Sequence, residues 1–414
     1  MKFIHAADIH LDSPLRGLSR YDGAPIEQIQ TATRRAFVKL IDFACNKAVD
    51  FVLLAGDLYD VDWKDYNTGL FFNQQMSRLR KANIPVFIIL GNHDADSVIT
   101  KQLRLPDNVI KFNYKQPETH KLEQLKVAIH GQSFAKKSVT DNISVSYPKA
   151  IPGYFNIGLL HTSLTGCPGH AKYAPCTKSD LLAHNYDYWA LGHIHKREIL
   201  HENPWIVFSG NLQGRHIRET GIKGCTLITV ENKITNLRFI PVDVLRWKVI
   251  NLNISDVEVI DNILDKVRET VNELTQQENI PLVLRFIIEG RCTFHNELHN
   301  NSTYWINEIR STVTDASLDN IWVEKVNIQT QTIRTISTQD EGPLAELSNF
   351  FHNLPQNEEE LQALLAEFKF LKNALPTDIQ QNEINLNNTD TICQLLGGVE
   401  ELLMARLQDK TSLG

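Results

Sequence analysis

Five short clusters of Asp, Asn and His follow directly after apolar runs in the first half of the chain. Seven of their members are side chains that commonly ligate metals: Asp8, His10, Asp57, Asn92, His161, His193 and His195. The set offers nitrogen and oxygen without a thiolate, which suits Mn²⁺, Fe or Zn²⁺ better than a cysteine-based structural site. Seven ligands exceed what one ion needs, and one carboxylate can bridge two ions. Because two adjacent ions clamp a phosphate and activate water, these residues predict metal-dependent phosphoester hydrolysis.

The order of the clusters carries more weight than any one of them. An HxH or a GDxxD sequence alone is more often a coincidence than a site. The ordered set DxH, GDxxD, GNHD, His and GHxH, with each member after a predicted strand, has little chance of arising at random. The alternative is that these are structural histidines with ordinary hydrogen-bond partners. That alternative needs five histidines to sit at strand ends for unrelated reasons.

The runs before these clusters predict the strands that position them. Seven apolar stretches have the pattern of strands, at residues 2–7, 51–56, 86–91, 126–131, 156–161, 188–193 and 205–210. They are nearly continuous rather than alternating, which indicates strands buried on both faces. Apolar residues at helical spacing predict amphipathic helices over 26–48 and 66–81. We therefore expect an α/β layered domain at 1–245, with the ligands at the carboxyl edge of the sheet, where such folds bind ligands.

Beyond residue 245 the pattern changes. Strand and helix patterns alternate more loosely and predict a small α+β domain at 246–334, then a polar linker at 335–343 and a helical segment at 344–414. The expected elements are strands at 249–254, 282–290 and 322–330 and helices at 257–276, 304–313, 344–354, 358–374 and 391–409.

The composition is that of a soluble globular protein. Hydrophobic residues make up 42% of the 414 residues and charged residues 22%, which excludes a disordered, collagen-like or disulfide-stapled chain. No apolar run approaches the ~20 residues needed to cross a bilayer, and the six cysteines form no CxxC pair. We expect a cytoplasmic protein with reduced thiols and no membrane partner.

The net charge of −7 is distributed unevenly. Residues 1–250 carry 31 Lys and Arg against 23 Asp and Glu, whereas residues 251–414 carry 11 against 26. A basic first part favours a polyanionic substrate there. The alternative is that the C-terminal helices simply have solvated acidic faces.

The motif set resembles that of the calcineurin-like metallophosphoesterase superfamily over roughly the first 245 residues, which implies a layered αββα domain. The resemblance implies one metal ion on Asp8, His10, Asp57 and His195, and a second on Asp57, Asn92, His161 and His193. It also implies that His93 and Asp94 are catalytic. His93 would contact the scissile phosphate and help to protonate the leaving oxygen, and Asp94 would orient His93 by a hydrogen bond. We expect two divalent ions, Mn²⁺ first, with Fe, Zn²⁺ and Mg²⁺ as alternatives.

Within the superfamily, the opening HAADIHLDSPLRG, the GDLYD sequence and the added small domain resemble SbcD-type DNA repair exonucleases. The segment SGNLQGRHIRETGIKG at 209–224 is similar to the YhaO-like branch of that group. The chain lacks the Arg-Gly that phosphoprotein phosphatases of this fold carry after the second Asp of GDxxD. Some nucleases of the group have a second catalytic His where this chain has Asp60. The resemblance therefore implies hydrolysis but leaves the details of substrate positioning open.

Several basic and aromatic residues on predicted loops are candidates for substrate contact. The principal ones are Arg16, Arg215, His216 and Arg218; the others are Arg20, Tyr21, Trp63, Lys136, Lys137 and Lys223. If the cations face the metal edge, they would neutralise backbone phosphates and make binding salt-dependent. The alternatives are a solvated rim for the cations and ordinary packing for the aromatic residues.

The additional domains suggest partners. The small domain resembles the capping domain of SbcD-type nucleases, which limits substrate access. The C-terminal helices carry an apolar stripe of Leu361, Leu364, Leu365, Phe368 and Leu371. Such a stripe is more often an internal contact than a partner surface, but in SbcD-type proteins this region docks an SMC-like ATPase of the SbcC kind. Homodimers are common in the family.

Three functions remain at this point. The first is a two-metal DNA exonuclease, with single-strand endonuclease activity as an extension, that serves as the nuclease subunit of a DNA repair complex. The second is a phosphatase or phosphodiesterase of the same fold that acts on nucleotides or small phosphoesters. The third is a scaffold that retains metal without catalysis, which the complete ligand set and His93 disfavour.

Overall fold

The computed structural model describes most of the first 333 residues and part of the remainder. The described residues are 1–13, 31–60, 66–96, 104–164, 173–232, 234–317, 320–333 and 343–354, with positions 357, 360, 361, 363, 364, 392, 396, 399 and 403. The chain divides into two units, which are described separately. Unit 1 is Met1–Val249, Thr275–Arg285 and Asp319–Glu324; unit 2 is Ile250–Leu274, Phe286–Leu318 and Lys325–Gly414.

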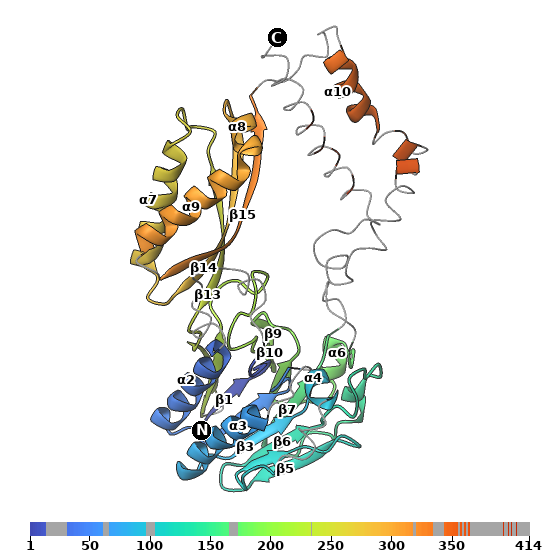
Figure 1. The fold of residues 1–414 in the computed structure, drawn as a ribbon. Helices are drawn as coiled ribbons and strands as arrows, with labels where there is room; N and C mark the ends of the chain where they lie inside the picture. Colours follow the sequence, from blue (N-terminus) through green and yellow to red (C-terminus); the bar gives the residue numbers. More distant parts are fainter. Residues whose placement is uncertain are drawn as a thin grey trace. The chain divides into compact units, whose positions relative to one another are not determined.

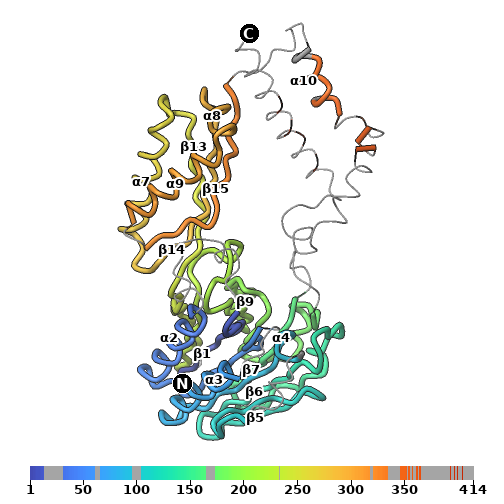
Figure 2. Tube along the Cα trace, viewed as in Figure 1, coloured from blue at the N-terminus to red at the C-terminus, as the bar shows by residue number. Residues whose placement is uncertain are grey.

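Two six-stranded sheets lie at the centre of the described part of unit 1 (Figures 1 and 2). The first sheet has the order β12-β11-β1-β2-β3-β4. Its strands are β1 (Lys2–Ala6), β2 (Phe51–Ala55), β3 (Val86–Ile89), β4 (Val109–Lys111), β11 (Gly224–Glu231) and β12 (Ile234–Pro241). The second has the order β5-β6-β7-β8-β10-β9. Its strands are β5 (Glu118–Leu122), β6 (Val127–Gly131), β7 (Phe155–His161), β8 (Tyr188–Gly192), β9 (Glu198–Glu202) and β10 (Trp205–Phe208).

The centre of each sheet is parallel. In the first sheet, β1, β2, β3 and β4 pair in parallel, and β11 and β12 add antiparallel strands at one side. In the second sheet, β6, β7, β8 and β10 are parallel, with β5 and β9 antiparallel at the edges. The carboxyl ends of the parallel strands therefore lie together at one edge of each sheet.

Helices cover the outer faces of the two sheets. The apolar sides of α2 (Ala32–Lys47) and α3 (Tyr66–Lys81) share a core with the first sheet. The short helices η1 (Ile143–Ser146) and α6 (Lys178–Leu182) lie over a core on the outer face of the second. A third core, which includes Phe3, Leu53 and Ile157, fills the space between the sheets. This four-layer arrangement confirms the predicted αββα fold.

The seven predicted strands of this region are all present, with ends that differ by one or two residues. The structure adds five strands that the sequence did not predict: β4, β5, β9, β11 and β12. Helix α3 has the predicted bounds, and α2 begins within the predicted helix, whose first residues lie outside the described part of the chain.

The described part of unit 2 has an α+β pattern. Strands β13 (Arg246–Asn253), β14 (Leu282–Cys292) and β15 (Ile321–Thr332), which reach into both units, form a sheet in that order. Figure 1 shows α7 (Asn262–Gln277) and α9 (Ser302–Ser317) beside this sheet. Helix α8 (His295–Asn300) was not predicted, and α10 (Pro343–Asn353) follows further on.

Most of the predicted C-terminal helices lie outside the described residues. Of the apolar stripe, Leu361 and Leu364 are described and belong to a small cluster with Leu354, Ile392 and Leu396. The other three members of the stripe are outside the described part. Among the helices that the structure describes, none combines the length and apolar character that a membrane crossing requires.

Candidate metal centre

The loops that follow β1 and β2 run side by side as they leave the sheet. The backbone N–H of Asp8 donates to the Gly56 carbonyl at 3.0 Å, and that of His10 donates to the Asp57 carbonyl at 3.0 Å. Asp8, His10 and Asp57 all have a positive φ, between 45° and 51°. Non-glycine residues pay for this conformation, and such strain gathers at functional sites. The sheet thus holds these side chains at its edge in a costly backbone conformation.

Two glycines next to the candidate ligands admit no side chain. Gly56 has φ +91°, and a Cβ there would lie 2.6 Å from Nδ1 of His161. A Cβ at Gly91 would overlap the Asp57 carboxylate. Gly56 is therefore required both by its dihedral angle and by the close approach of His161, and Gly91 by close approach alone.

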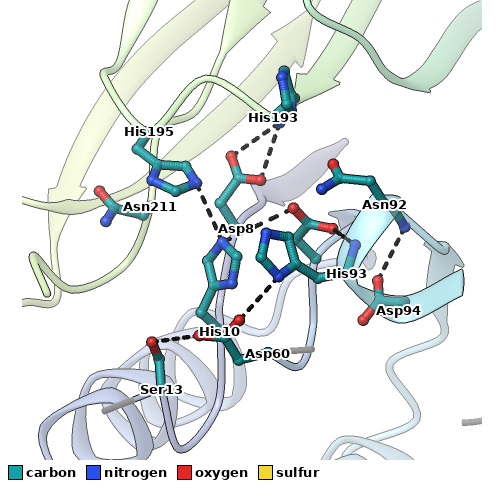
Figure 3. Close-up of polar contacts among 12 residues, drawn as sticks. Asp8, His10, Ser13, Asp60, Asn92, His93, Asp94, His193, His195 and Asn211 are labelled. Carbon is teal, nitrogen blue, oxygen red and sulfur yellow. Dashed lines mark hydrogen bonds and ion pairs between the residues drawn. The ribbon is translucent and has the colours of Figure 1, made fainter. Parts of the chain in front are cut away.

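Two candidate ligands after β1 and a third, His195, far from them in the sequence form the first group. One ligating atom each of Asp8, His10 and His195 lies within 4.8 Å of the others. Nε2 of His10 and Nε2 of His195 are 3.2 Å apart, and Figure 3 shows the two rings facing each other. Asp8 also accepts the backbone N–H of His193 through both carboxylate oxygens, at 3.0 and 3.1 Å, which joins the edges of the two sheets.

A second group contains Asp57, His161 and His193, whose ligating atoms also lie within 4.8 Å of one another. Nε2 of His161 is 3.0 Å from Oδ1 of Asn92 and 3.4 Å from Oδ2 of Asp57. Asn92 begins the short helix α4 (Asn92–Asp96) after β3. The same Asp57 oxygen is 3.9 Å from Nε2 of His10, so Asp57 lies between the two groups.

The chemistry of His161 fits a bound cation. Its Nδ1 lies 2.9 Å from the Ala55 carbonyl, which can only accept, so Nδ1 carries the hydrogen. In the neutral ring, Nε2 then carries a lone pair and can only accept. Its two neighbours, Asn92 Oδ1 and Asp57 Oδ2, are acceptors as well, so three acceptors face one another. A metal ion satisfies converging acceptors of this kind, and a carbonyl bond on the other ring nitrogen is typical of ligating histidines.

The electrostatics point the same way. Burial disfavours the charged form of His161, but the Asp57 carboxylate raises the pKa of His161 to about 9. Burial would raise the pKa of Asp57, yet His161 and His93 hold it below its ordinary value. Burial and the neighbouring positive groups, Arg215 first, lower the pKa of His10. The protein therefore places a buried carboxylate where it attracts positive charge.

His93 is paired with Asp60 rather than with Asp94. Nδ1 of His93 is 2.9 Å from Oδ1 of Asp60, and its side chain remains 28% exposed (Figure 3). Asp60 also accepts the Ser13 hydroxyl at 2.7 Å. Burial lowers the pKa of His93, but the hydrogen bond and charge of Asp60, together with the charge of Asp57, raise it above its ordinary value overall.

Asp94 has a different position from the one predicted. Its buried carboxylate accepts the backbone N–H groups of Leu58, Tyr59 and Gly91 at 2.9 to 3.1 Å. Neighbouring side chains on a helix do not face each other, so Asp94 points to the loop after β2 while His93 points to the centre. Burial and the charge of Asp57 raise the pKa of Asp94 to about 7. The expected hydrogen bond from Asp94 to His93 is therefore wrong, and Asp94 instead ties the loops after β2 and β3 together.

The residues expected to bind substrate have mixed positions. Arg215 is 13% exposed and lies between the carboxylates of Asp60 and Glu219, at 3.7 and 3.1 Å. His216 also approaches Glu219, at 3.5 Å, whereas Arg218 is exposed. Lys223 is buried and donates to the backbone carbonyl of His195 at 3.1 Å, which is a structural contact. Lys136 and Lys137 are exposed; Arg16, Arg20, Tyr21 and Trp63 lie outside the described residues.

Sequence reasoning missed two residues of the site. Glu219 approaches Nδ1 of His195 at 2.6 Å, and Ser13 contacts both Asp60 and Arg215. Neither lies directly after a strand, so the pattern that identified the ligands could not find them. The only sequence signal was their place in the segments DIHLDS and RHIRETG.

Comparison with known proteins agrees with this geometry. Residues 1–197 match the calcineurin-like phosphoesterase family, and residues 247–331 match the middle domain of metallophosphoesterase YhaO. An uncharacterized metallophosphoesterase YhaO of Bacillus subtilis (strain 168) is 35% identical over 70% of this chain and 72% of its own. The DNA double-strand break repair protein Mre11 of Sulfurisphaera tokodaii is 26% identical over 73% of this chain and 79% of its own.

Among solved structures, a dimetal phosphatase from Danio rerio overlaps 58% of this chain and 96% of its own at 10% identity, with a TM-score of 0.36, which adds nothing to the assignment. A third group, His10, Asp60 and His93, also has ligating atoms within 4.8 Å of one another. The family match and the first two groups together support a centre for two divalent ions. The chain belongs to the calcineurin-like metallophosphoesterases and, within them, to the YhaO branch.

Proposed function

We propose that this phosphoesterase hydrolyses DNA phosphodiester bonds with two divalent metal ions, as the cytoplasmic nuclease subunit of a DNA repair complex. We expect exonuclease activity and, in addition, cleavage of single strands. The observation that carries the proposal is the convergence of two three-residue ligand groups. Asp57 of the second group also approaches His10 of the first, and the partly exposed His93 lies beside them.

The proposal assigns the ligands to two ions. Asp8, His10, Asp57 and His195 would hold one, and Asp57, Asn92, His161 and His193 would hold the other, with Asp57 shared. Bound there, the ions would neutralise the phosphate and supply hydroxide at neutral pH. The nitrogen and oxygen donors suit Mn²⁺, and we propose it as the physiological metal.

His93 is proposed as the proton donor to the leaving oxygen. Its Nδ1 is occupied by Asp60, which leaves Nε2 as the ring atom for the substrate. The carboxylates around the ring raise its pKa, so a larger share of His93 is protonated near neutral pH. Asp60 would hold the ring orientation, the task that the sequence had assigned to Asp94.

The choice of DNA is supported by the relatives and by charge. Several of the similar proteins are named as DNA double-strand break repair proteins, and their similarity extends over about two thirds or more of this chain. The first 250 residues also carry an excess of basic residues, which favours a polyanion. We further propose an SbcC-like SMC-type ATPase as partner of the C-terminal helices, and a homodimer as the assembled form.

A cleavage assay tests the proposal. End-labelled linear duplex and single-stranded DNA would be incubated with Mn²⁺ and the wild-type protein, beside a small phosphodiester and the His93→Ala variant. We expect the wild type to cut DNA and the variant to leave it intact, and the fragment ladder then reports polarity. Turnover of the small ester while DNA stays intact would point to a phosphatase for small phosphoesters, or to a nuclease that needs its ATPase partner before long DNA can enter.

A further inference from the structure

Segment 209–224 brings a buried carboxylate against one candidate ligand. Glu219 is 6% exposed, and its Oε1 lies 2.6 Å from Nδ1 of His195. Its Oε2 accepts the Asn211 side-chain amide at 2.9 Å and the Arg215 backbone N–H at 2.8 Å. A buried carboxylate with these donors is held in one position, because movement would leave its charge unpaired.

This contact determines which nitrogen of His195 faces the centre. Nδ1 of His195 lies 2.6 Å from the Glu219 carboxylate, which only accepts, and 3.2 Å from Nη2 of Arg215, which only donates. The shorter contact favours a hydrogen on Nδ1, which leaves the lone pair on Nε2. Nε2 is also the atom that lies 3.2 Å from Nε2 of His10. The Glu219 contact therefore selects the ring form and the orientation that a metal ligand needs at this position.

Arg215 continues the contact to the other side of the centre. Its Nη2 donates to Oε1 of Glu219 at 3.1 Å, and its Nη1 is 3.7 Å from Oδ2 of Asp60 and 3.4 Å from Ser13 Oγ. Asp60 in turn contacts Nδ1 of His93 at 2.9 Å. An unbroken series of charged contacts thus runs from His195 to His93.

We propose that Glu219 and Arg215 are positioning residues that hold the ligand His195 and, through Asp60, the proton donor His93 in one common geometry. The inference rests on the proposed metal centre but not on DNA as the substrate. Glu219 acts on the metal side by fixing His195. Arg215 acts on the proton-transfer side by fixing the Asp60 carboxylate.

The surroundings of Arg215 distinguish this role from phosphate binding. Its guanidinium already faces two carboxylates and is only 13% exposed. If Arg215 turned to bind a phosphate, the buried carboxylates of Glu219 and Asp60 would each lose a positively charged partner. Such a loss is unfavourable for buried charges. Arg218, in the same segment, is exposed and is the better candidate for a phosphate contact.

Calorimetric titration of Mn²⁺ into the metal-free full-length protein tests the role of Glu219. Glu219→Gln keeps the size of the side chain but removes its charge. We expect one of two Mn²⁺ ions to bind about 10- to 100-fold more weakly, with the other unchanged. If Glu219→Gln does not fold, Glu219→Asp serves the same comparison, since it keeps the charge but shortens the reach to His195.

Hydrolysis of bis(p-nitrophenyl) phosphate at saturating Mn²⁺ tests the role of Arg215. We expect Arg215→Gln to bind both ions normally and to lower kcat about tenfold with KM unchanged. Because Arg215 acts through Asp60, the double variant Arg215→Gln/Asp60→Asn should lose less kcat than the product of the fold-losses of the two single variants. Arg246→Gln is the control: Arg246 forms a similar ion pair with Asp243, and we expect no change in either readout.

Three results would overturn the inference. Unchanged affinity for both ions in Glu219→Gln would exclude a role for Glu219 in holding His195. A raised KM with normal kcat in Arg215→Gln would make Arg215 a substrate contact. Equal losses of Mn²⁺ affinity or kcat in Arg246→Gln would show that Glu219 and Arg215 contribute only to the general stability of the protein. Failure of the wild type to bind Mn²⁺ at all would instead refute the proposed metal centre itself.

Discussion

His161 and His195 present the same ring nitrogen to the candidate centre, but the structure holds them in different ways. Nδ1 of His161 donates to a backbone carbonyl of β2, at Ala55. Nδ1 of His195 donates to the side chain of Glu219, on a segment that follows β10. One half of the centre therefore follows from the sheet itself. The other half depends on a particular side chain and can be altered while the sheet stays intact.

His5 also contacts a backbone carbonyl through one ring nitrogen, but no candidate metal group among the described residues includes it. This buried residue of β1 donates from Nε2 to the Leu191 carbonyl at 3.1 Å, and its Nδ1 accepts the Tyr188 hydroxyl at 2.9 Å. Both ring nitrogens are thus satisfied by neutral groups. In His161 the second nitrogen faces a carboxylate instead, and that difference separates a structural histidine from a candidate ligand.

The largest effect should come from the residue that both halves share. Asp57 approaches His161 on one side and His10 on the other, so Asp57→Ala should lose both ions and reduce hydrolysis to background. Metal analysis by mass spectrometry and turnover of a small phosphodiester measure this. Asp42→Ala, at an exposed ion pair of α2, is the control. Two retained ions in Asp57→Ala would contradict the shared role.

His93→Ala should separate chemistry from metal binding. Because His93 is proposed to donate a proton rather than to ligate, we expect both ions to remain and kcat to fall about 10²- to 10⁴-fold. The same metal analysis and turnover assay apply. Loss of one ion in this variant would move His93 into the ligand set and refute its assigned role.

Asp60→Asn should have a smaller effect of the same kind. Asn keeps an oxygen near Nδ1 of His93 but removes the negative charge that Arg215 and His93 both contact. We expect about a tenfold fall in kcat, which corresponds to ~1.4 kcal/mol of transition-state stabilisation, with metal content unchanged. Unchanged turnover would show that orientation of His93 does not depend on this carboxylate.

The smallest effect concerns stability rather than activity. Burial lowers the pKa of His5 to about 3 from 6.5, so the unfolded chain takes up a proton below pH 6.5 while the folded one does not until about pH 3. Stability attributable to His5 is therefore lost as the pH falls across this window, by up to about 1.4 kcal/mol per pH unit. His5→Gln should flatten the pH dependence of the urea midpoint; an unchanged slope would contradict this.

The strands that position the ligands could be predicted because they are buried on both faces. Their apolar runs are nearly continuous, and each ends at a candidate ligand. Strands β11 and β12 were missed because only part of each is covered: the burial of β12 alternates between intermediate and exposed along most of its length. The sequence ITNLRFIP of β12 does not alternate strictly between apolar and polar residues, so it lacks the period-two pattern that identifies a half-buried strand.

The side chains that contact the candidate ligands and His93 could not be predicted from the sequence. Asp94 is next to His93 in the sequence, whereas Asp60 belongs to the separate GDLYD motif. Only the paths of the loops decide which carboxylate meets the ring. Glu219 is 24 residues from His195 in sequence and does not lie directly after a strand. Spacing along strands predicts which side chains reach the sheet edge, but contacts between separate loops require the folded structure.

Anomalous diffraction from crystals of the full-length protein soaked in Mn²⁺ tests the central claim most directly. The account predicts two Mn²⁺ peaks, one among Asp8, His10 and His195 and one among His161, His193 and Asn92, with Asp57 contacting both. A single peak, or Mn²⁺ bound away from these side chains, would contradict a two-metal centre at this edge of the sheets.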